Sequence, residues 1–140
     1  MKKIKRNLII LVVLIPACAG YGFYMYKKKP TDIRKEEAQY QIDAAVLLSE
    51  FNKDETAANK KYIDKIIAVQ GKVADIKIDT GGEATVFLAS GDPMASVTCS
   101  FYREETPSVK QIKQGELVIV KGKCTGKLMD VVLNKCSLIK

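Results

Sequence analysis

The chain has 140 residues, which is enough for one folded domain with a short appendage. It contains no His, so catalysis by a His base, nucleophiles of the Ser-His-Asp and Cys-His types, and His-ligated metals are excluded. The net charge of +7 comes from residues 1–29, because residues 30–140 hold 16 basic and 16 acidic side chains. The folded part is therefore electrically balanced.

An uncharged run covers residues 8–26, between a short basic N-terminus at residues 1–7 and three lysines at residues 27–29. As a helix this run is about 28 Å long, close to the roughly 30 Å of a bilayer's hydrocarbon core. It predicts a single transmembrane helix that anchors the chain in the lipid bilayer. Two other interpretations stay open: a cleaved signal segment with a small-x-small site at residues 17–19, and a lipoprotein signal at Cys18. All three place the folded domain outside the cytoplasm, on the periplasmic or extracellular face.

Two short helices are predicted after a charged juxtamembrane linker at residues 27–41. Asp43 is suited to cap the first helix, because Asp at this position accepts hydrogen bonds from the first turn. Asp54 is suited to cap a second helix that runs through Tyr62. The first helix has one apolar face, formed by Ala44, Leu47, Leu48 and Phe51.

After Asp64 the apolar residues recur with the period of two that is typical of β-strands. The alternation slips by one residue near Ala74 and Asp75, which predicts a β-bulge in a long first strand. Residues 103–115 are polar and are expected to form a loop with a helical turn before the fourth strand. Five strands are predicted, at residues 67–78, 86–88, 97–101, 117–124 and 129–139.

The folded part also resembles a known family. Residues 58–73 (ANKKYIDKIIAVQGKV) look like the entry signature of the bacterial tRNA-anti-like OB-fold family, and residues 97–101, 115–126 and 130–136 are similar to its later segments. The resemblance covers residues 42–140. It implies an all-β core with an α lead-in: a five-stranded OB-fold barrel preceded by one or two short helices. Family members carry an N-terminal signal or a single membrane span, which fits the predicted N-terminal transmembrane helix. The resemblance implies a fold but no catalytic activity, because no reaction is assigned to the family.

Two glycines fit such a barrel on physical grounds. Gly71 leaves room for close backbone approach in the long, coiled first strand. Gly122 lies between two inward-facing positions of the fourth strand, where a side chain would crowd the point of barrel closure.

An OB fold directs attention to the outer face of its second and third strands, where oligonucleotides and oligosaccharides bind. The alternation makes Lys72, Phe87, Ser100 and Tyr102 the expected ligand contacts on this face. Phe87 has an alternative place in the core, under the first helix. The leading prediction is a membrane-tethered binding module for an envelope protein, a glycan or another polar ligand. A single-stranded nucleic-acid-binding domain is the alternative, placed second because the domain has little excess positive charge.

No enzyme active site, cofactor or metal site is predicted. The chain lacks a P-loop, a dinucleotide fingerprint and a nucleophile elbow. The acids Asp75, Asp79, Glu83 and Asp92 adjoin Gly-rich turns and are interpreted as turn residues.

The domain cysteines are Cys99, Cys124 and Cys136, and no pair of them has the CxxC spacing of redox motifs and zinc sites. Each lies in an apolar, strand-like segment. They are interpreted as buried structural residues, with one disulfide between two of them as the alternative.

Overall fold

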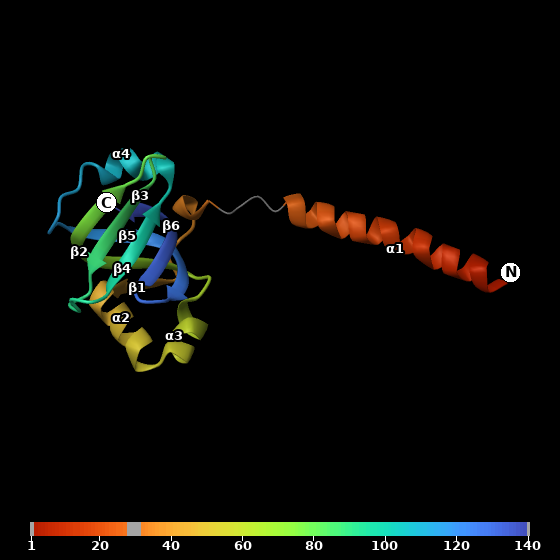
Figure 1. The fold of residues 1–140 in the computed structure, drawn as a ribbon, viewed down its shortest axis with the longest axis horizontal. Helices are drawn as coiled ribbons and strands as arrows, with labels where there is room; N and C mark the ends of the chain where they lie inside the picture. Colours follow the sequence, from red (N-terminus) through yellow and green to blue (C-terminus); the bar gives the residue numbers. More distant parts are fainter. Residues whose placement is uncertain (1, 28–31, 140) are drawn as a thin grey trace. The chain divides into compact units, whose positions relative to one another are not determined.

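The computed structural model describes residues 2–27 and 32–139, which belong to two separate units. The first unit contains one helix, α1 (Lys2–Lys27) (Figure 1). No helix in the described part of the chain is long and apolar enough to cross a membrane, so the transmembrane helix predicted at residues 8–26 is not found. Residues 28–31 of the predicted linker lie outside the described residues.

The second unit is built around a closed, five-stranded barrel. Its strands follow the order β2-β3-β4-β6-β5, and β5 pairs with β2 to close the barrel. The pair β4–β6 is parallel and the other four pairs are antiparallel. The predicted OB-like barrel is confirmed, with the strands β2 (Ile66–Ile78), β3 (Ala84–Ala89), β4 (Ser96–Phe101), β5 (Leu117–Lys127) and β6 (Val131–Ile139).

The long strand β2 belongs to both halves of the barrel. Its first half pairs with β5 and its second half pairs with β3. The pairing register shifts between Val73 and Asp75, which confirms the predicted bulge. Gly71 lies where the strand bends past α2, and a Cβ at this position would lie 3.1 Å from the Cβ of Ala44. The bulge and the glycine together allow one strand to turn around the core.

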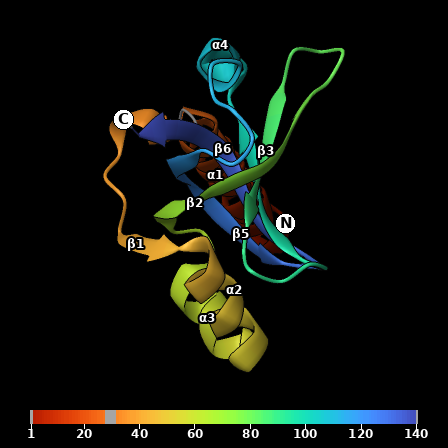
Figure 2. The ribbon, with the colours of Figure 1, turned by 90° about the vertical axis from the view of Figure 1, so that its left-hand side faces the viewer.

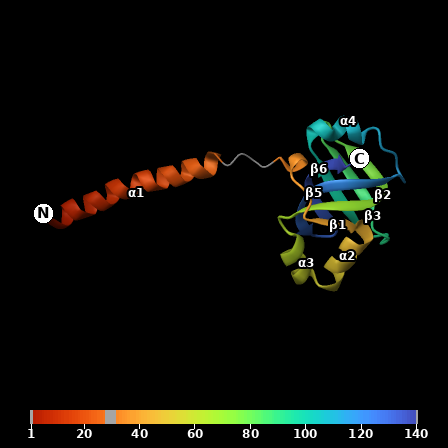
Figure 3. The same ribbon diagram turned by 180° about the vertical axis from the view of Figure 1, so that it is seen from behind.

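Two helices cover one end of the barrel, as Figures 1 and 3 show. They are α2 (Ala44–Lys53) and α3 (Glu55–Tyr62). The Asp54 carboxylate accepts a 3.0 Å hydrogen bond from the Ala57 N–H and caps α3 as predicted, whereas Asp43 occupies the N-cap of α2 without a side-chain bond. The predicted apolar face of α2 is buried and contributes to the core.

Two elements occupy a stretch where the sequence predicts a linker. A 3-10 turn, η1 (Ile33–Lys35), buries its isoleucine, and a sixth strand, β1 (Tyr40–Asp43), pairs in parallel with the first half of β2. The strand β1 is short and its side chains are mostly exposed. Its residues do alternate between apolar and polar, but over only four positions directly before a helix cap, which is a weak strand signal. The folded unit begins at Asp32.

The other end of the barrel carries η2 (Arg103–Glu105) and α4 (Thr106–Val109), in agreement with the helical turn predicted at residues 103–115. Figure 2 shows α4 next to the β2–β3 hairpin. The Thr106 hydroxyl donates a 2.7 Å hydrogen bond to the carbonyl oxygen of Gly82 in that hairpin. This bond joins the two connections at the same end of the barrel.

The three domain cysteines are free and buried in the described structure. Burial and a hydrogen bond with Cys99 raise the pKa of Cys136, and burial raises the pKa of Cys124. Buried thiols with raised pKa values are poor nucleophiles, so these residues act in packing. Gly122 faces one of them, because a Cβ at Gly122 would lie 2.5 Å from the Cys136 Sγ.

Candidate functional site

One row of residues crosses the outside of the barrel over all five strands. Phe87 on β3 pairs with Asp75 on β2 and with Thr98 on β4. Thr98 pairs with Val132 on β6, which in turn pairs with Gly126 on β5. We call these five residues the cross-strand row. With neighbouring strands about 4.8 Å apart, the row is about 19 Å long.

The row faces away from the core. Phe87, Thr98 and Val132 are half-buried, and in each strand their sequence neighbours are fully buried core residues. Since side chains alternate between the two faces of a strand, the row must point outward. Phe87 is therefore a surface ring on the barrel wall and not part of the core under α2. The buried neighbours are Val86, Leu88, Val97, Cys99, Val131 and Leu133.

Lysines flank the row at both ends. The Lys77 Nζ lies 5.2 Å from the centre of the Phe87 ring, in cation–π contact. Lys127 follows Gly126 in β5, at the other end. Among the ion pairs of the described residues, none involves either lysine. Both ammonium groups are therefore available to an anionic ligand.

An aspartate fixes the turn between β5 and β6 beside the row. Asp130 accepts a 2.8 Å hydrogen bond from the Ser96 N–H and a 3.1 Å hydrogen bond from the Thr98 hydroxyl. The Thr98 hydroxyl uses its proton in this bond and keeps its acceptor capacity. These bonds tie the β5–β6 turn to the start of β4, so the middle of the row is rigid and already in place before a ligand arrives.

At the β5 end, the row opens into a pocket between α3 and the β5–β6 turn. The pocket has a volume of about 340 Å³. Gly126 is buried beside it with a φ of 110°, and a Cβ there would lie 3.5 Å from the Ile63 Cδ1 and 3.6 Å from the Asn59 Oδ1. A larger side chain at Gly126 would occupy this space. The lining residues are Asn59, Ile63, Thr125, Gly126, Lys127, Leu128 and Val132.

The structure brings together only two of the four ligand contacts expected from the sequence. Ser100 pairs with Thr85 on the same outer surface as Phe87. Lys72 is exposed, but it pairs with Leu117 in the half of β2 that faces β5, away from the row. The cation beside Phe87 is instead Lys77, on the other side of the bulge.

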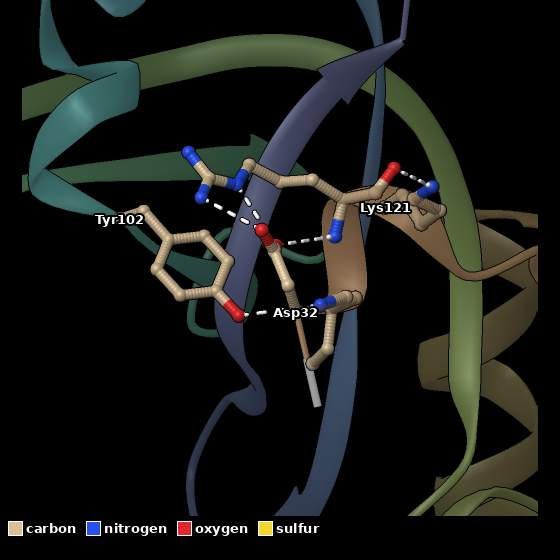
Figure 4. A network of polar contacts seen from close by, with 5 residues as sticks. Asp32, Tyr102 and Lys121 are labelled. Atoms are coloured by element: carbon tan, nitrogen blue, oxygen red, sulfur yellow. Dashed lines mark hydrogen bonds and ion pairs between the residues drawn. The ribbon is translucent and has the colours of Figure 1, made fainter. Parts of the chain in front are cut away.

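Tyr102, the fourth expected contact, is covered by the chain itself. Its hydroxyl oxygen accepts a 3.4 Å hydrogen bond from the Ile33 N–H, and the Arg34 guanidinium lies 5.0 Å from its ring centre. Figure 4 shows this contact together with Lys121, whose Nζ donates a 3.1 Å hydrogen bond to the carbonyl oxygen of Arg34. The same Nζ donates a 2.6 Å hydrogen bond to the carbonyl oxygen of Glu36. We call the segment 32–36, held in this way, the N-terminal clasp.

The clasp is also ordered within itself. The Asp32 carboxylate accepts a bond from the Arg34 N–H and forms a 2.8 Å ion pair with the Arg34 guanidinium. This hydrogen bonding lowers the pKa of Asp32 to about 2. The sequence gives no sign of the clasp, because its charged residues are typical of a linker and its contacts come from residues more than 60 positions away.

A second polar cluster joins α2 to α3. The Tyr62 hydroxyl donates a hydrogen bond to Glu50, and the Lys61 ammonium lies 4.9 Å from the Tyr62 ring centre. Burial raises the pKa of Tyr62. The cluster holds the two helices together, and Glu50 and Lys61 also line a small cavity of about 190 Å³ between them. In the described residues, no group of three metal-ligating side chains is found.

Solved structures with a similar fold exist. A "putative nucleic acid-binding lipoprotein" from Klebsiella pneumoniae superimposes with a TM-score of 0.61 at 17% identity, over 80% of this chain and 100% of that one. The Stn1–Ten1 complex of S. pombe gives a TM-score of 0.42 at 18% identity, over 54% of this chain and 58% of that one. The likeness to the Klebsiella protein supports the OB-like fold of this chain. The comparison with curated proteins yields no match.

The family assignment covers more of the chain than these superpositions. The model of the tRNA_anti-like family matches residues 1–138, which include the helical lead-in and all of the barrel except the last residue of β6. The closed strand order, the coiled strand β2 and the glycines that relieve its crowding agree with the OB fold expected for this family. The chain belongs to the tRNA_anti-like family of OB-fold domains.

Proposed function

We propose that the domain is a non-catalytic binding module that holds a single-stranded nucleic acid along the cross-strand row. The observation that carries this proposal is the arrangement of Lys77, Phe87 and Lys127: a half-exposed ring with a cation beside it, and a second cation at the far end of the row. Single-strand binders use this combination, because bases stack on aromatic rings and phosphates pair with lysines.

Each part of the row has a chemical role in this proposal. Phe87 stacks on one base, and Thr98 accepts a hydrogen bond from the ligand while Asp130 holds its proton. Lys77 and Lys127 contact phosphates. Two phosphate contacts on a single strand give a slope of about −1.4 for the logarithm of affinity against the logarithm of salt concentration. With one stacking ring and two cations, binding is weak and only moderately sensitive to salt.

A glycan is the second candidate ligand. It is favoured by the charge balance of residues 30–140, which hold 16 basic and 16 acidic side chains. OB folds bind oligosaccharides over the same strands, and a ring such as Phe87 offers an apolar face to a sugar. A glycan would bind to the same row with no dependence on salt, and this distinguishes the two candidates.

The test is fluorescence anisotropy of the full chain with labelled single-stranded DNA and RNA oligonucleotides at increasing salt concentration. Phe87→Ala is expected to weaken binding by about 1–3 kcal/mol, the value of one stacked base. Lys77→Ala is expected to weaken binding and to reduce the salt slope by about 0.7. Lys72→Ala is the matched control, because this lysine is on the same strand and away from the row. Equal loss of affinity in Lys72→Ala and Lys77→Ala would contradict the proposal.

The non-catalytic part is tested with the same material. The oligonucleotide is expected to be intact after prolonged incubation with the protein, with and without added divalent metal. Cleavage that is lost in Phe87→Ala would assign a reaction to the row and overturn this part of the proposal.

A further inference from the structure

The pocket between α3 and the β5–β6 turn continues the row, and the structure suggests what it binds. Val132 belongs to both, since it pairs with Thr98 in the row and lines the pocket. Val132 lies two strands away from Phe87, or about 10 Å along the row. A chain that stacks a base on Phe87 and follows the row therefore reaches the pocket with one of its next bases.

The pocket has the size and the walls for one base. Its volume of about 340 Å³ is at the lower end of the range for small-molecule sites. Ile63 and Val132 form apolar walls, and Leu128 stands at the rim with 90% of its surface exposed. A base that leaves its stack can be held between aromatic or apolar side chains in a protein pocket, and this pocket offers apolar ones.

The polar groups of the pocket are suited to reading a base edge. Asn59 offers an amide with one acceptor and two donor hydrogens, and its side chain has no hydrogen bond to any other described residue. The Thr125 hydroxyl donates a 3.1 Å hydrogen bond to the Val132 carbonyl oxygen, which leaves it acceptor capacity only. Lys127 adds a cation at the pocket, where the phosphate of the same nucleotide would lie.

We infer that this pocket reads a single adenine base of the bound strand, with Asn59 as its specificity-determining residue. The inference rests on the proposed function and adds base selection to it. An Asn amide pairs with adenine through two parallel hydrogen bonds, accepting from the N6 amino group and donating to N7. Thr125 takes a further hydrogen bond from the ligand, and Lys127 pairs with the adjoining phosphate.

The experiment measures the binding of the full chain to labelled oligo(dA), oligo(dC) and oligo(dT) of equal length. Oligo(dA) is expected to bind roughly five- to 150-fold more tightly than the other two, the discrimination of one bidentate base contact. Asn59→Ala is expected to bind all three oligonucleotides alike. Asn59→Asp is expected to lose the preference for oligo(dA), because a carboxylate has no N–H to donate to the adenine N7. Asn52→Ala, on the exposed surface of α2, is the matched control.

The outcomes separate this inference from the proposed function. If the unmodified chain binds the three oligonucleotides equally and Phe87→Ala weakens this binding, the row is supported as the binding surface. The adenine pocket is overturned by the same result. Retention of the oligo(dA) preference in Asn59→Ala would also overturn the pocket. Binding of adenosine monophosphate is measured separately, from NMR shifts of the Ile63 and Leu128 methyl groups. Methyl shifts without oligonucleotide binding would support the pocket but overturn the row as a binding surface. If neither methyl shifts nor oligonucleotide binding is seen, both the pocket and the row are overturned.

Discussion

Lys121 on β5 donates a 2.6 Å hydrogen bond from its Nζ to the carbonyl oxygen of Glu36, a residue 85 positions earlier in the chain. The same ammonium group binds the carbonyl oxygen of Arg34. One side chain therefore holds two backbone groups of the N-terminal clasp against the barrel. Ile33, which is 3% exposed, adds an apolar contact at the same place.

Lys121→Ala is expected to release the clasp without unfolding the barrel. The loss of two hydrogen bonds at a partly exposed site lowers the free energy of unfolding by only about 1 kcal/mol. Hydrogen exchange at the amides of residues 33–36 should become faster, while the strands keep their protection. Lys123→Ala is the control, because its ammonium contacts Asp64 and not the clasp. Unchanged exchange at residues 33–36 in Lys121→Ala would show that the buried Ile33 and the contacts with Tyr102 hold the segment without Lys121.

Gly122→Ala is expected to destabilise the domain, since its Cβ would lie 2.5 Å from the Cys136 Sγ and 3.2 Å from the Asn134 carbonyl oxygen. Overpacking of this kind costs about 1–3 kcal/mol, measured by urea denaturation. Cys136→Ala removes the sulfur, so the double variant should lose less stability than the sum of the two single variants. Additive losses would mean that the backbone contact, and not the thiol, makes glycine necessary.

Phe87→Ala and Phe51→Ala are expected to differ widely in stability. Phe51 is 1% exposed in the core, and its truncation should cost about 3–5 kcal/mol. Phe87 is half-buried on the outer wall, and its truncation should cost about 1 kcal/mol. Urea denaturation of the two variants measures both values. Losses of similar size would place Phe87 in the core and remove it from the proposed binding surface.

Stability is expected to fall above about pH 9. Burial raises the pKa values of Cys124 and Cys136 above the ordinary thiol value of 9.0, so the unfolded chain loses these protons at a lower pH than the folded chain does. The unfolded state then binds fewer protons, and the free energy of unfolding decreases as the pH rises through this range. Thermal unfolding between pH 7 and pH 10 measures the effect in solution, with Cys124→Ala as the comparison. An equal decrease in Cys124→Ala would assign the whole effect to other groups.

The barrel is predictable from the sequence because β3, β4 and β5 alternate between core and surface along their whole length. The slip at Ala74 and Asp75 also reveals the bulge that joins the two halves of β2. Alternation indicates which face a residue occupies, but not which residue lies beside it. For this reason Lys72 is predicted on the outer face with Phe87, whereas the strand register places Lys77 there.

The clasp and the pocket depend on contacts that no local pattern encodes. Tyr102 follows the alternation of β4 and is expected on the open surface, yet Ile33 and Arg34 reach it from 69 and 68 positions away. Asn59 belongs to a helix whose own pattern shows only that one face is buried. Its place in the pocket follows from the packing of α3 against the β5–β6 turn.

The clasp also determines where a mechanical load would enter the domain. A pull on the chain before Asp32 would act first on the bonds from Lys121 to Arg34 and Glu36, and on the buried Ile33. The strand β1 would remain paired with β2 until those contacts broke. Because Lys121 projects from a strand paired on both edges, the force would pass into the closed barrel as a whole. The domain would resist being peeled open from its N-terminal edge.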